Sequence, residues 1–211
     1  MTRFPFSVVV FDLDGTLLDT APDLTAALNH SLTELGYPTV PEASVRDMIG
    51  HGARALLKKG LAAHGAHDEA LVDKGFPIFI DHYRAHIADG SRPFPGLEAA
   101  LDRLTAEGAV LAICTNKMES LSRQLIDTIG WQSRFAALIG GDTLPVRKPD
   151  PAPLFEAVAR SGGGRAAFVG DSITDTLTGQ NAKIPTVAVT FGFSDRPHDQ
   201  LGADRLIDHY D

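Results

Sequence analysis

The chain has 211 residues, of which 44% are hydrophobic, and its formal net charge is −8 at pH 7. This length allows one large domain or two modest ones with a buried core. The negative charge argues against binding to nucleic acid or to an anionic membrane, because both partners need clustered positive charge. The only cysteine is Cys114, so no intrachain disulfide can form, and its place in an apolar run favours a small core residue over a nucleophile.

No apolar run approaches the length of a membrane-spanning helix, and the first residues lack the basic-then-apolar order of a signal peptide. Residues 1–5 are expected to form a short tail ahead of the first strand. Together with the lone cysteine, these features predict a cytoplasmic protein without a membrane partner. Both a monomer and a homodimer remain open.

The first predicted strand covers residues 7–11 and runs directly into Asp12, Asp14 and Gly15. The period of two in an extended chain puts both carboxylates on the same side. Two like charges at a strand end are costly without a cation, so the pair predicts a bound metal ion or a shifted pKa. In isolation, the same residues could instead begin an Asp-Gly turn of a hairpin.

Residues 18–91 predict an inserted helical cap domain. Its first helix has Thr20 as a plausible N-cap, Pro22 in the first turn and Gly36 at its end. The apolar face of this helix contains Leu24, Leu28, Leu32 and Leu35. Prolines in residues 92–96 mark the return to the core, which would then comprise residues 1–17 and 92–211.

The remaining chain alternates short apolar runs with helical periodicity. The runs cover residues 110–114, 136–139, 166–169 and 186–190, and the helices between them include two that end near Gly108 and Gly130. This alternation is typical of strands in a parallel sheet with helical crossovers. The core is therefore predicted to be α/β, with a Rossmann-like parallel sheet.

Polar side chains gather where the predicted strands end. Thr115 and Asn116 follow the second run, Asp171 and Asp175 follow the fourth, and Lys148 precedes the helix that leads to the fourth. Because ligands bind at the carboxyl ends of parallel strands, we expect these residues to meet Asp12 and Asp14 at one edge of the sheet.

These residue types suit the chemistry of a phosphomonoester. Asp12 can attack phosphorus as a nucleophile, and Asp14 can protonate the leaving oxygen and then activate water. The Thr115 hydroxyl and the Asn116 backbone N–H can donate to the phosphoryl oxygens, while Lys148 supplies a positive charge. Alone, a lysine is more often a solvated side chain.

Asp171 suits a direct ligand of Mg2+, which prefers oxygen donors. Asp175 is expected to orient water or Lys148 without binding the metal ion directly. A first-turn acid of a helix that has Ser172 as its N-cap is the plainer interpretation of Asp175.

Four segments complete the pattern: DLDGTLLD from residue 12, CTNK from residue 114, RKPDP from residue 147 and GDSITD from residue 170. As a set and in this order, they resemble the four motifs of the haloacid dehalogenase-like hydrolase superfamily. The helical insert resembles the cap of the subgroup that contains phosphoglycolate phosphatase, and residues 49–53 resemble the cap loop that faces the active site in that subgroup.

The resemblance implies a Mg2+-dependent phosphatase that acts on a small phosphorylated metabolite through a phosphoaspartyl intermediate on Asp12. Its leading substrate would be 2-phosphoglycolate. It also implies that Asp12, Asp171 and the backbone carbonyl of Asp14 bind the metal ion. The alternatives are a phosphotransferase related to β-phosphoglucomutase, a pyrophosphatase or nucleotidase of the same superfamily, and a non-enzymatic binding module, which predicts at least one damaged motif.

Three residues of the cap loop and its following helix are candidates for contact with the substrate. His51 and Gly52 lie in the loop itself, and His51 could equally be a simple exposed residue. Arg54 could bind a substrate carboxylate, but further lysines on the same helix favour a solvated surface. Elsewhere, Lys183 departs from the family pattern, which has a glycine at its position, and is expected to alter a turn without changing the chemistry.

Overall fold

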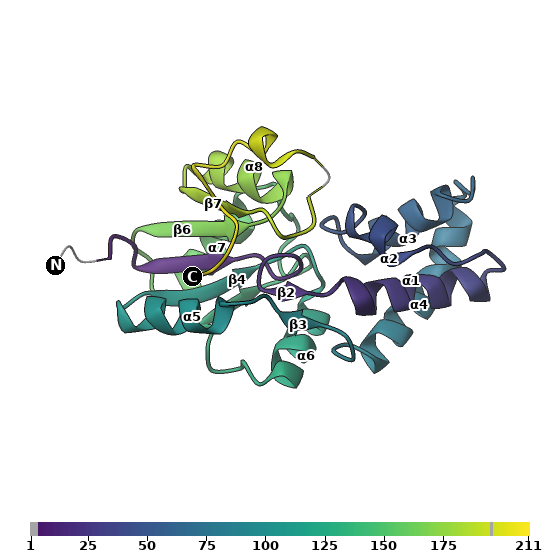
Figure 1. The fold of residues 1–211 in the computed structure, drawn as a ribbon, viewed down its shortest axis with the longest axis horizontal. Helices are drawn as coiled ribbons and strands as arrows, with labels where there is room; N and C mark the ends of the chain where they lie inside the picture. The colour runs from purple at the N-terminus through teal and green to yellow at the C-terminus, as the bar shows by residue number, and fades with distance from the viewer. Residues whose placement is uncertain (1–3, 195) are drawn as a thin grey trace.

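The computed structural model describes residues 4–194 and 196–211. The first three residues of the predicted tail lie outside the described residues. Figure 1 shows two parts, an α/β core that carries both termini and a helical cap at its side. None of the described helices combines the length and the apolar character needed to span a bilayer.

A six-stranded sheet forms the centre of the core, with the order β5-β4-β1-β6-β7-β8 and parallel pairing throughout. The predicted parallel α/β core is therefore confirmed. β1 lies between β4 and β6, so that the carboxyl ends of three strands are adjacent. The strands are β1 (Val8–Phe11), β4 (Val110–Cys114), β5 (Ala137–Ile139), β6 (Ala166–Gly170), β7 (Thr186–Val189) and β8 (Arg205–Ile207).

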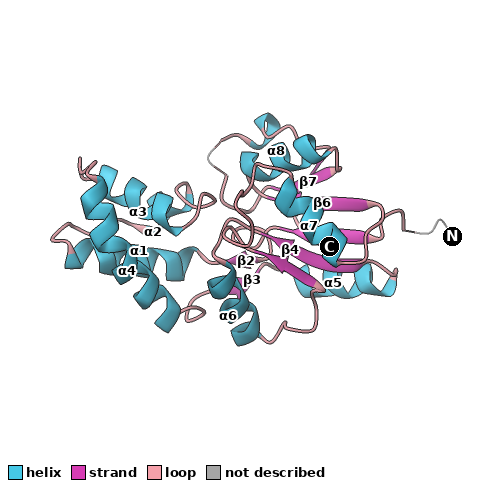
Figure 2. Ribbon diagram, turned by 180° about the vertical axis from the view of Figure 1, so that it is seen from behind, coloured by secondary structure: helices cyan, strands magenta, loops and turns pink. Residues whose placement is uncertain are grey.

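Helices cover both faces of the sheet (Figure 2). On one face, Val9 of β1 belongs to the same buried cluster as residues of α5 (Leu97–Ala106) and α6 (Glu119–Ile129). On the other face, Val8 clusters with residues of α7 (Ala152–Arg160) and α8 (Ile173–Ala182). A strand that is buried on both faces needs apolar residues at every position, which explains the unbroken apolar run of β1.

All five predicted strands are present, but the sequence did not predict β8 or the short 3-10 helix η1 (His198–Gln200) before it. β8 has three residues at the edge of the sheet, and its Leu206 is 46% exposed. So short and partly exposed a strand gives no alternating pattern to detect. The two core helices that were predicted to end near Gly108 and Gly130 are α5 and α6, and both end there. After α6, Gly130 lies in the left-handed region at φ 85°.

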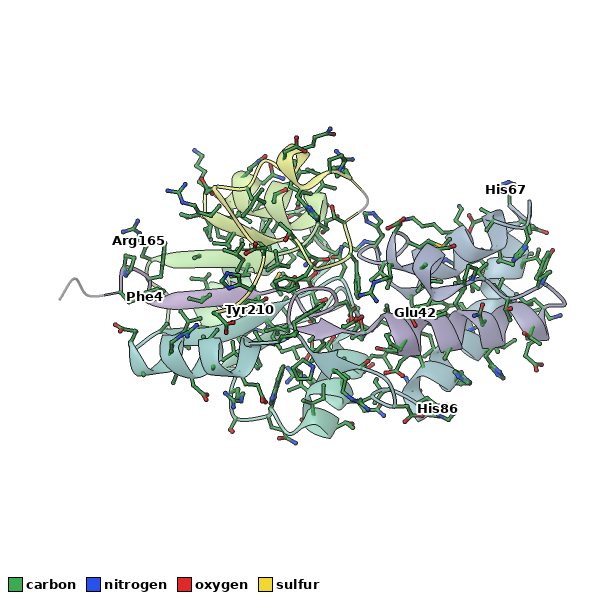
Figure 3. The ribbon with its side chains drawn as sticks, in the orientation of Figure 1. Phe4, Glu42, His67, His86, Arg165 and Tyr210 are labelled. Carbon is green, nitrogen blue, oxygen red and sulfur yellow. The ribbon has the colours of Figure 1, made fainter. Side chains whose placement is uncertain are left out.

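The cap comprises α1 (Ala21–Glu34), α2 (Glu42–Arg46), α3 (Ala53–Ala62) and α4 (Glu69–Ala85). Its apolar centre includes Leu28 and Leu32 of α1 and Phe79 of α4, all of which are fully buried. His67 and His86 point outward from the cap, as Figure 3 shows, and both are exposed.

A short antiparallel ribbon connects the core to the cap. It pairs β2 (Leu18–Asp19) with β3 (Arg92–Pro93), close to both ends of the predicted insert. Next to it, the buried carboxylate of Asp23 accepts hydrogen bonds of 2.7 Å from the backbone N–H groups of Gly90 and Ser91. Asp23 therefore ties the start of α1 to the returning chain.

Candidate active site

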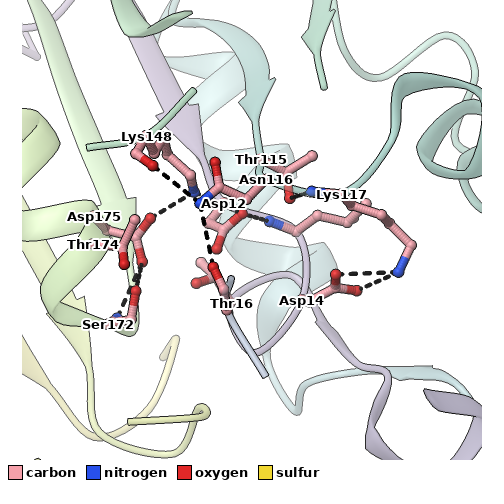
Figure 4. Close-up of polar contacts among 12 residues, drawn as sticks. Asp12, Asp14, Thr16, Thr115, Asn116, Lys117, Lys148, Ser172, Thr174 and Asp175 are labelled. Carbon is pink, nitrogen blue, oxygen red and sulfur yellow. Dashed lines mark hydrogen bonds and ion pairs between the residues drawn. The ribbon is translucent and has the colours of Figure 1, made fainter. Parts of the chain in front are cut away.

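Three buried carboxylates meet beyond the carboxyl end of β1, and Figure 4 labels two of them, Asp12 and Asp175. Asp12 follows β1 directly, Asp171 follows the neighbouring strand β6, and Asp175 lies in the first turn of α8. Each offers a carboxylate oxygen, and these oxygens lie within 4.8 Å of one another. The structure thus brings together side chains that are far apart in the sequence, as predicted from their positions after the carboxyl ends of the strands.

Lys148 lies between two of these acids. Its Nζ is 2.6 Å from Oδ1 of Asp175 and 3.0 Å from Oδ1 of Asp12, and its side chain is 1% exposed. Burial alone would lower the pKa of Lys148, but the carboxylates of Asp12 and Asp175 raise it above the ordinary value. A permanent positive charge is therefore fixed beside Asp12.

The protein's own cations do not neutralise this cluster. Burial raises the pKa of Asp12 to about 6, against the opposing effect of Lys148. Burial, followed by the charges of Asp175 and Asp12, raises the pKa of Asp171 well above its ordinary value. An all-oxygen donor set with surplus negative charge is what a hard divalent cation prefers, and the residues present fit such an ion.

Asp171 is held in place from two sides. The Thr16 hydroxyl donates to Oδ1 at 2.8 Å, and the backbone N–H of Phe193 donates to Oδ2 at 2.6 Å. Gly15 allows this approach, because a Cβ at its position, where φ is +83°, would lie 2.3 Å from Oδ2 of Asp171. The glycine of the first motif is therefore required by space as well as by backbone conformation.

Asp175 makes contacts with both of its oxygens. Oδ1 accepts from Lys148, while Oδ2 accepts from the Ser172 hydroxyl at 2.7 Å and from the backbone N–H groups of Asp171 and Ser172. Ser172 is the N-cap of α8, and a capping box links it to Asp175. These contacts support a role for Asp175 in orienting Lys148, and the predicted N-cap is present.

Asp14 contacts a second cation, Lys117, which the sequence offers only as the last residue of the CTNK segment. Lys117 Nζ lies 2.8 and 3.1 Å from the two carboxylate oxygens of Asp14. The Thr20 hydroxyl also donates to Asp14 at 2.8 Å, so although Thr20 is the N-cap residue of α1, its hydroxyl does not cap the helix. The position of Lys117 next to Asn116 was the one available signal for this contact.

A pocket lies between these polar residues and the cap. Asn116 closes part of it, because its Nδ2 donates to the backbone oxygens of Gly50 at 3.3 Å and of Lys148 at 3.2 Å. Thr115 also lines the pocket, at the end of β4. The remaining lining residues are Asp12, Asp14, Leu24, Ile49, Gly50, Gly52, Ala53, Leu56, Phe79, Tyr83, Lys117, Met118 and Leu121.

Of the three candidate cap residues, Gly52 lines the pocket, whereas His51 and Arg54 are not among the described residues that line it. Arg54 instead pairs with Asp73 at 2.5 Å and with Glu69 at 3.5 Å, both on α4. With about half of its side chain exposed, Arg54 occupies the surface position that its neighbouring lysines favoured.

Comparison with known proteins supports the family that the four motif segments resemble. The model of the family described as haloacid dehalogenase-like hydrolase matches residues 9–189. A phosphoglycolate phosphatase of Caulobacter vibrioides is 47% identical over 208 residues, covering 95% of this chain and 86% of the relative. One from Mesorhizobium japonicum is 45% identical over 207 residues, covering 97% of this chain and 91% of the relative.

Solved structures share the fold over nearly the whole chain. A crystal structure described as a predicted phosphoglycolate phosphatase from Haemophilus somnus has a TM-score of 0.91 and 28% identity, covering 99% of this chain and 96% of that one. One described as a putative haloacid dehalogenase-like hydrolase from Bacteroides fragilis has a TM-score of 0.85 at 21% identity, a likeness of fold alone. Since the family match extends from β1 to β7 and contains all four motif segments, this chain belongs to the haloacid dehalogenase-like hydrolases.

Proposed function

We propose that this hydrolase converts 2-phosphoglycolate to glycolate and phosphate, with Mg2+ as its metal ion. The observation that carries the proposal is the buried group formed by Asp12, Lys148 and Asp171 at the carboxyl end of β1. The names of the relatives at 45% and 47% identity support the substrate. Those names also favour hydrolysis over phosphotransfer to a sugar, and the presence of every motif residue disfavours a binding module.

In the first step, Asp12 attacks phosphorus. Its Oδ1 is occupied by the Leu13 backbone N–H at 2.7 Å and by Lys148 at 3.0 Å, which leaves Oδ2 as the attacking atom. The Oδ2–P bond forms as the bond from phosphorus to the ester oxygen breaks. Lys148, the Thr115 hydroxyl and the Asn116 backbone N–H would hold the phosphoryl oxygens.

Asp14 transfers the protons. A protonated Asp14 gives its proton to the leaving alkoxide in the first step, and the carboxylate so formed accepts a proton from the water that attacks the phosphoaspartate in the second. Thr20 and Lys117 fix its carboxylate at the pocket wall. Water attack breaks the Oδ2–P bond and restores Asp12.

The Mg2+ ion would be held by Asp12, Asp171 and the backbone carbonyl of Asp14. Asp175 would orient Lys148 without binding the ion directly. When bound, the ion would neutralise charge on the carboxylates and the phosphoryl group. The pocket between these residues and the cap would receive the leaving group.

The variant Asp12→Asn tests the nucleophile. Without the carboxylate no acyl phosphate forms, so kcat for 2-phosphoglycolate should fall by at least about 1,000-fold. Phosphate release with and without Mg2+ measures this, and circular dichroism checks folding. Asp127→Asn, on the exposed face of α6, is the matched control and should keep full activity.

Retention of Mg2+-dependent hydrolysis by the Asp12 variant would overturn the nucleophile assignment. A panel containing sugar phosphates, a nucleotide and pyrophosphate tests the substrate in the same assay. A higher kcat/KM for any of these than for 2-phosphoglycolate would contradict the proposed substrate.

A further inference from the structure

Lys117 is a buried cation in the pocket wall that the steps above do not use on the substrate. Its side chain is 5% exposed, and it donates hydrogen bonds to the two oxygens of Asp14. An ammonium group has three N–H donors, and these contacts use at most two. The third donor is left for the neighbouring Tyr83 hydroxyl and for an atom of a bound ligand.

Tyr83 lies beside Lys117 and comes from the cap. Its ring centroid is 4.5 Å from Lys117 Nζ, and the side chain is almost completely buried. Among residues 4–194 and 196–211, no group meets the geometry of a hydrogen bond to its hydroxyl, and the neighbouring cation that acts on this hydroxyl is Lys117. Buried polar groups are normally satisfied, and one that is not marks a place where a ligand atom can bind.

The surrounding wall is apolar, with Leu24, Leu56 and Phe79 among the lining residues. In such surroundings a charge is poorly screened by water, so when Asp14 carries the proton that it gives to the leaving group, an anion near Lys117 is attracted strongly, whereas a neutral group gains much less. The pocket therefore discriminates by charge on the part of the substrate that leaves.

We propose that Lys117 and Tyr83 form the subsite that binds a carboxylate on the leaving group. The proposal rests on the proposed function, since it concerns the same pocket. It fits the dimensions of 2-phosphoglycolate: the carboxylate carbon is two bonds from the ester oxygen that Asp14 protonates, and Lys117 is one hydrogen bond from Asp14. The enzyme would thereby select small phosphomonoesters whose alcohol carries a carboxylate.

The test compares two esters that differ only at this group. 2-Phosphoglycolate has a carboxylate where 2-hydroxyethyl phosphate has a neutral hydroxymethyl group. The measured quantity is the ratio of their kcat/KM values in the wild-type enzyme and in Lys117→Met. We expect the ratio to fall at least tenfold in the variant, mostly through a higher KM for 2-phosphoglycolate.

Two further lysine variants separate the lost charge from general damage. Lys117→Arg keeps a cation and should retain more of the ratio than Lys117→Met. Lys74→Met removes an exposed lysine on α4, away from the pocket, and should leave the ratio unchanged. A ratio in Lys117→Met within threefold of the wild-type value would overturn the proposal, because Lys117 would then act only through Asp14.

Tyr83→Phe removes only the hydroxyl. Since no described residue meets the geometry of a hydrogen bond to that hydroxyl, the variant should melt at the wild-type temperature or above. Its KM for 2-phosphoglycolate should rise about three- to tenfold. A lower melting temperature with unchanged KM would assign the hydroxyl a structural role and remove it from the subsite.

The outcomes distinguish the subsite from the function. Hydrolysis of both esters by the wild-type enzyme without preference would refute the subsite while leaving the phosphatase activity intact. If neither ester is hydrolysed, the proposed substrate fails. The same ratio measured with 2-phosphoglycerate and glycerol 2-phosphate, which also differ by a carboxylate and a hydroxymethyl group, then decides the subsite.

Discussion

At the residue scale, three buried carboxylates meet at the end of β1, and Lys148 neutralises only part of their charge. Burial has raised the pKa of Asp12 from 3.8 to about 6. In the metal-free protein a proton on Asp12 therefore stabilises the fold. This contribution is fully present below the ordinary pKa of 3.8 and is lost as the pH rises through about 6.

Mg2+ should take the place of that proton. Because the ion binds ionised carboxylates, the rise in melting temperature that it causes should increase with pH, from close to zero at pH 5 to about 4 °C or more at pH 8. Thermal melts with and without MgCl2 at a series of pH values measure this. Potassium chloride at equal ionic strength is the control, and a Mg2+ effect that is independent of pH would contradict the prediction.

At the element scale, α8 ends on a residue with unfavourable backbone geometry. Lys183 has φ 54° and ψ 37°, the left-handed conformation in which glycine is preferred. Lysine at this position departs from the family pattern and predicts a changed turn. The structure instead has the ordinary left-handed helix end, made by a residue poorly suited to it.

Replacement of Lys183 by glycine should stabilise the protein. The relief of strain exceeds the added entropy of the unfolded chain, so we expect a gain of about 0.5–1 kcal/mol in the free energy of unfolding. Urea denaturation measures it. Gly130→Ala is the reciprocal control, because Gly130 has φ +85° and nothing within 4 Å of an added Cβ, and it should cost a similar amount. Destabilisation by Lys183→Gly would show that the lysine side chain makes a compensating contact.

At the scale of the whole molecule, Arg46 makes one of the contacts between the cap and the core. From α2, its guanidinium pairs with Asp19 at 2.8 Å and lies 5.0 Å from the ring centroid of Phe193. The backbone N–H of Phe193 in turn holds Asp171. The position of the cap is thus linked to a side chain of the candidate metal site.

Arg46→Ala should loosen this contact. A cation–π interaction of about 1 kcal/mol corresponds to roughly a fivefold change, so kcat/KM should fall about fivefold. Steady-state kinetics and small-angle scattering measure the effect on activity and on cap position. Arg134→Ala, which breaks the exposed pair with Asp102 in the core, is the matched control. Unaltered kinetics and scattering in the Arg46 variant would disprove the link.

Across the whole molecule, the parts of the fold that could be predicted from the sequence are those with a local pattern. β1 and β4 could be predicted because strands buried on both faces require unbroken apolar runs. The end of α6 could be predicted because it is marked by a glycine next to it in the sequence. β8 could not be predicted, since three edge residues carry no periodicity. Asp12 and Asp171 were found for the same local reason, as polar residues placed directly after strands.

The sequence by itself determined the α/β core, the helical insert and the acids and cation at the strand ends, because each depends on neighbours within a few residues. Only the tertiary structure decided that Lys117 pairs with Asp14 and that Tyr83 lies beside them. It also decided that Arg54 pairs with α4 instead of lining the pocket. Such contacts depend on how the cap packs on the core, and packing between distant segments leaves no periodic signal in either one.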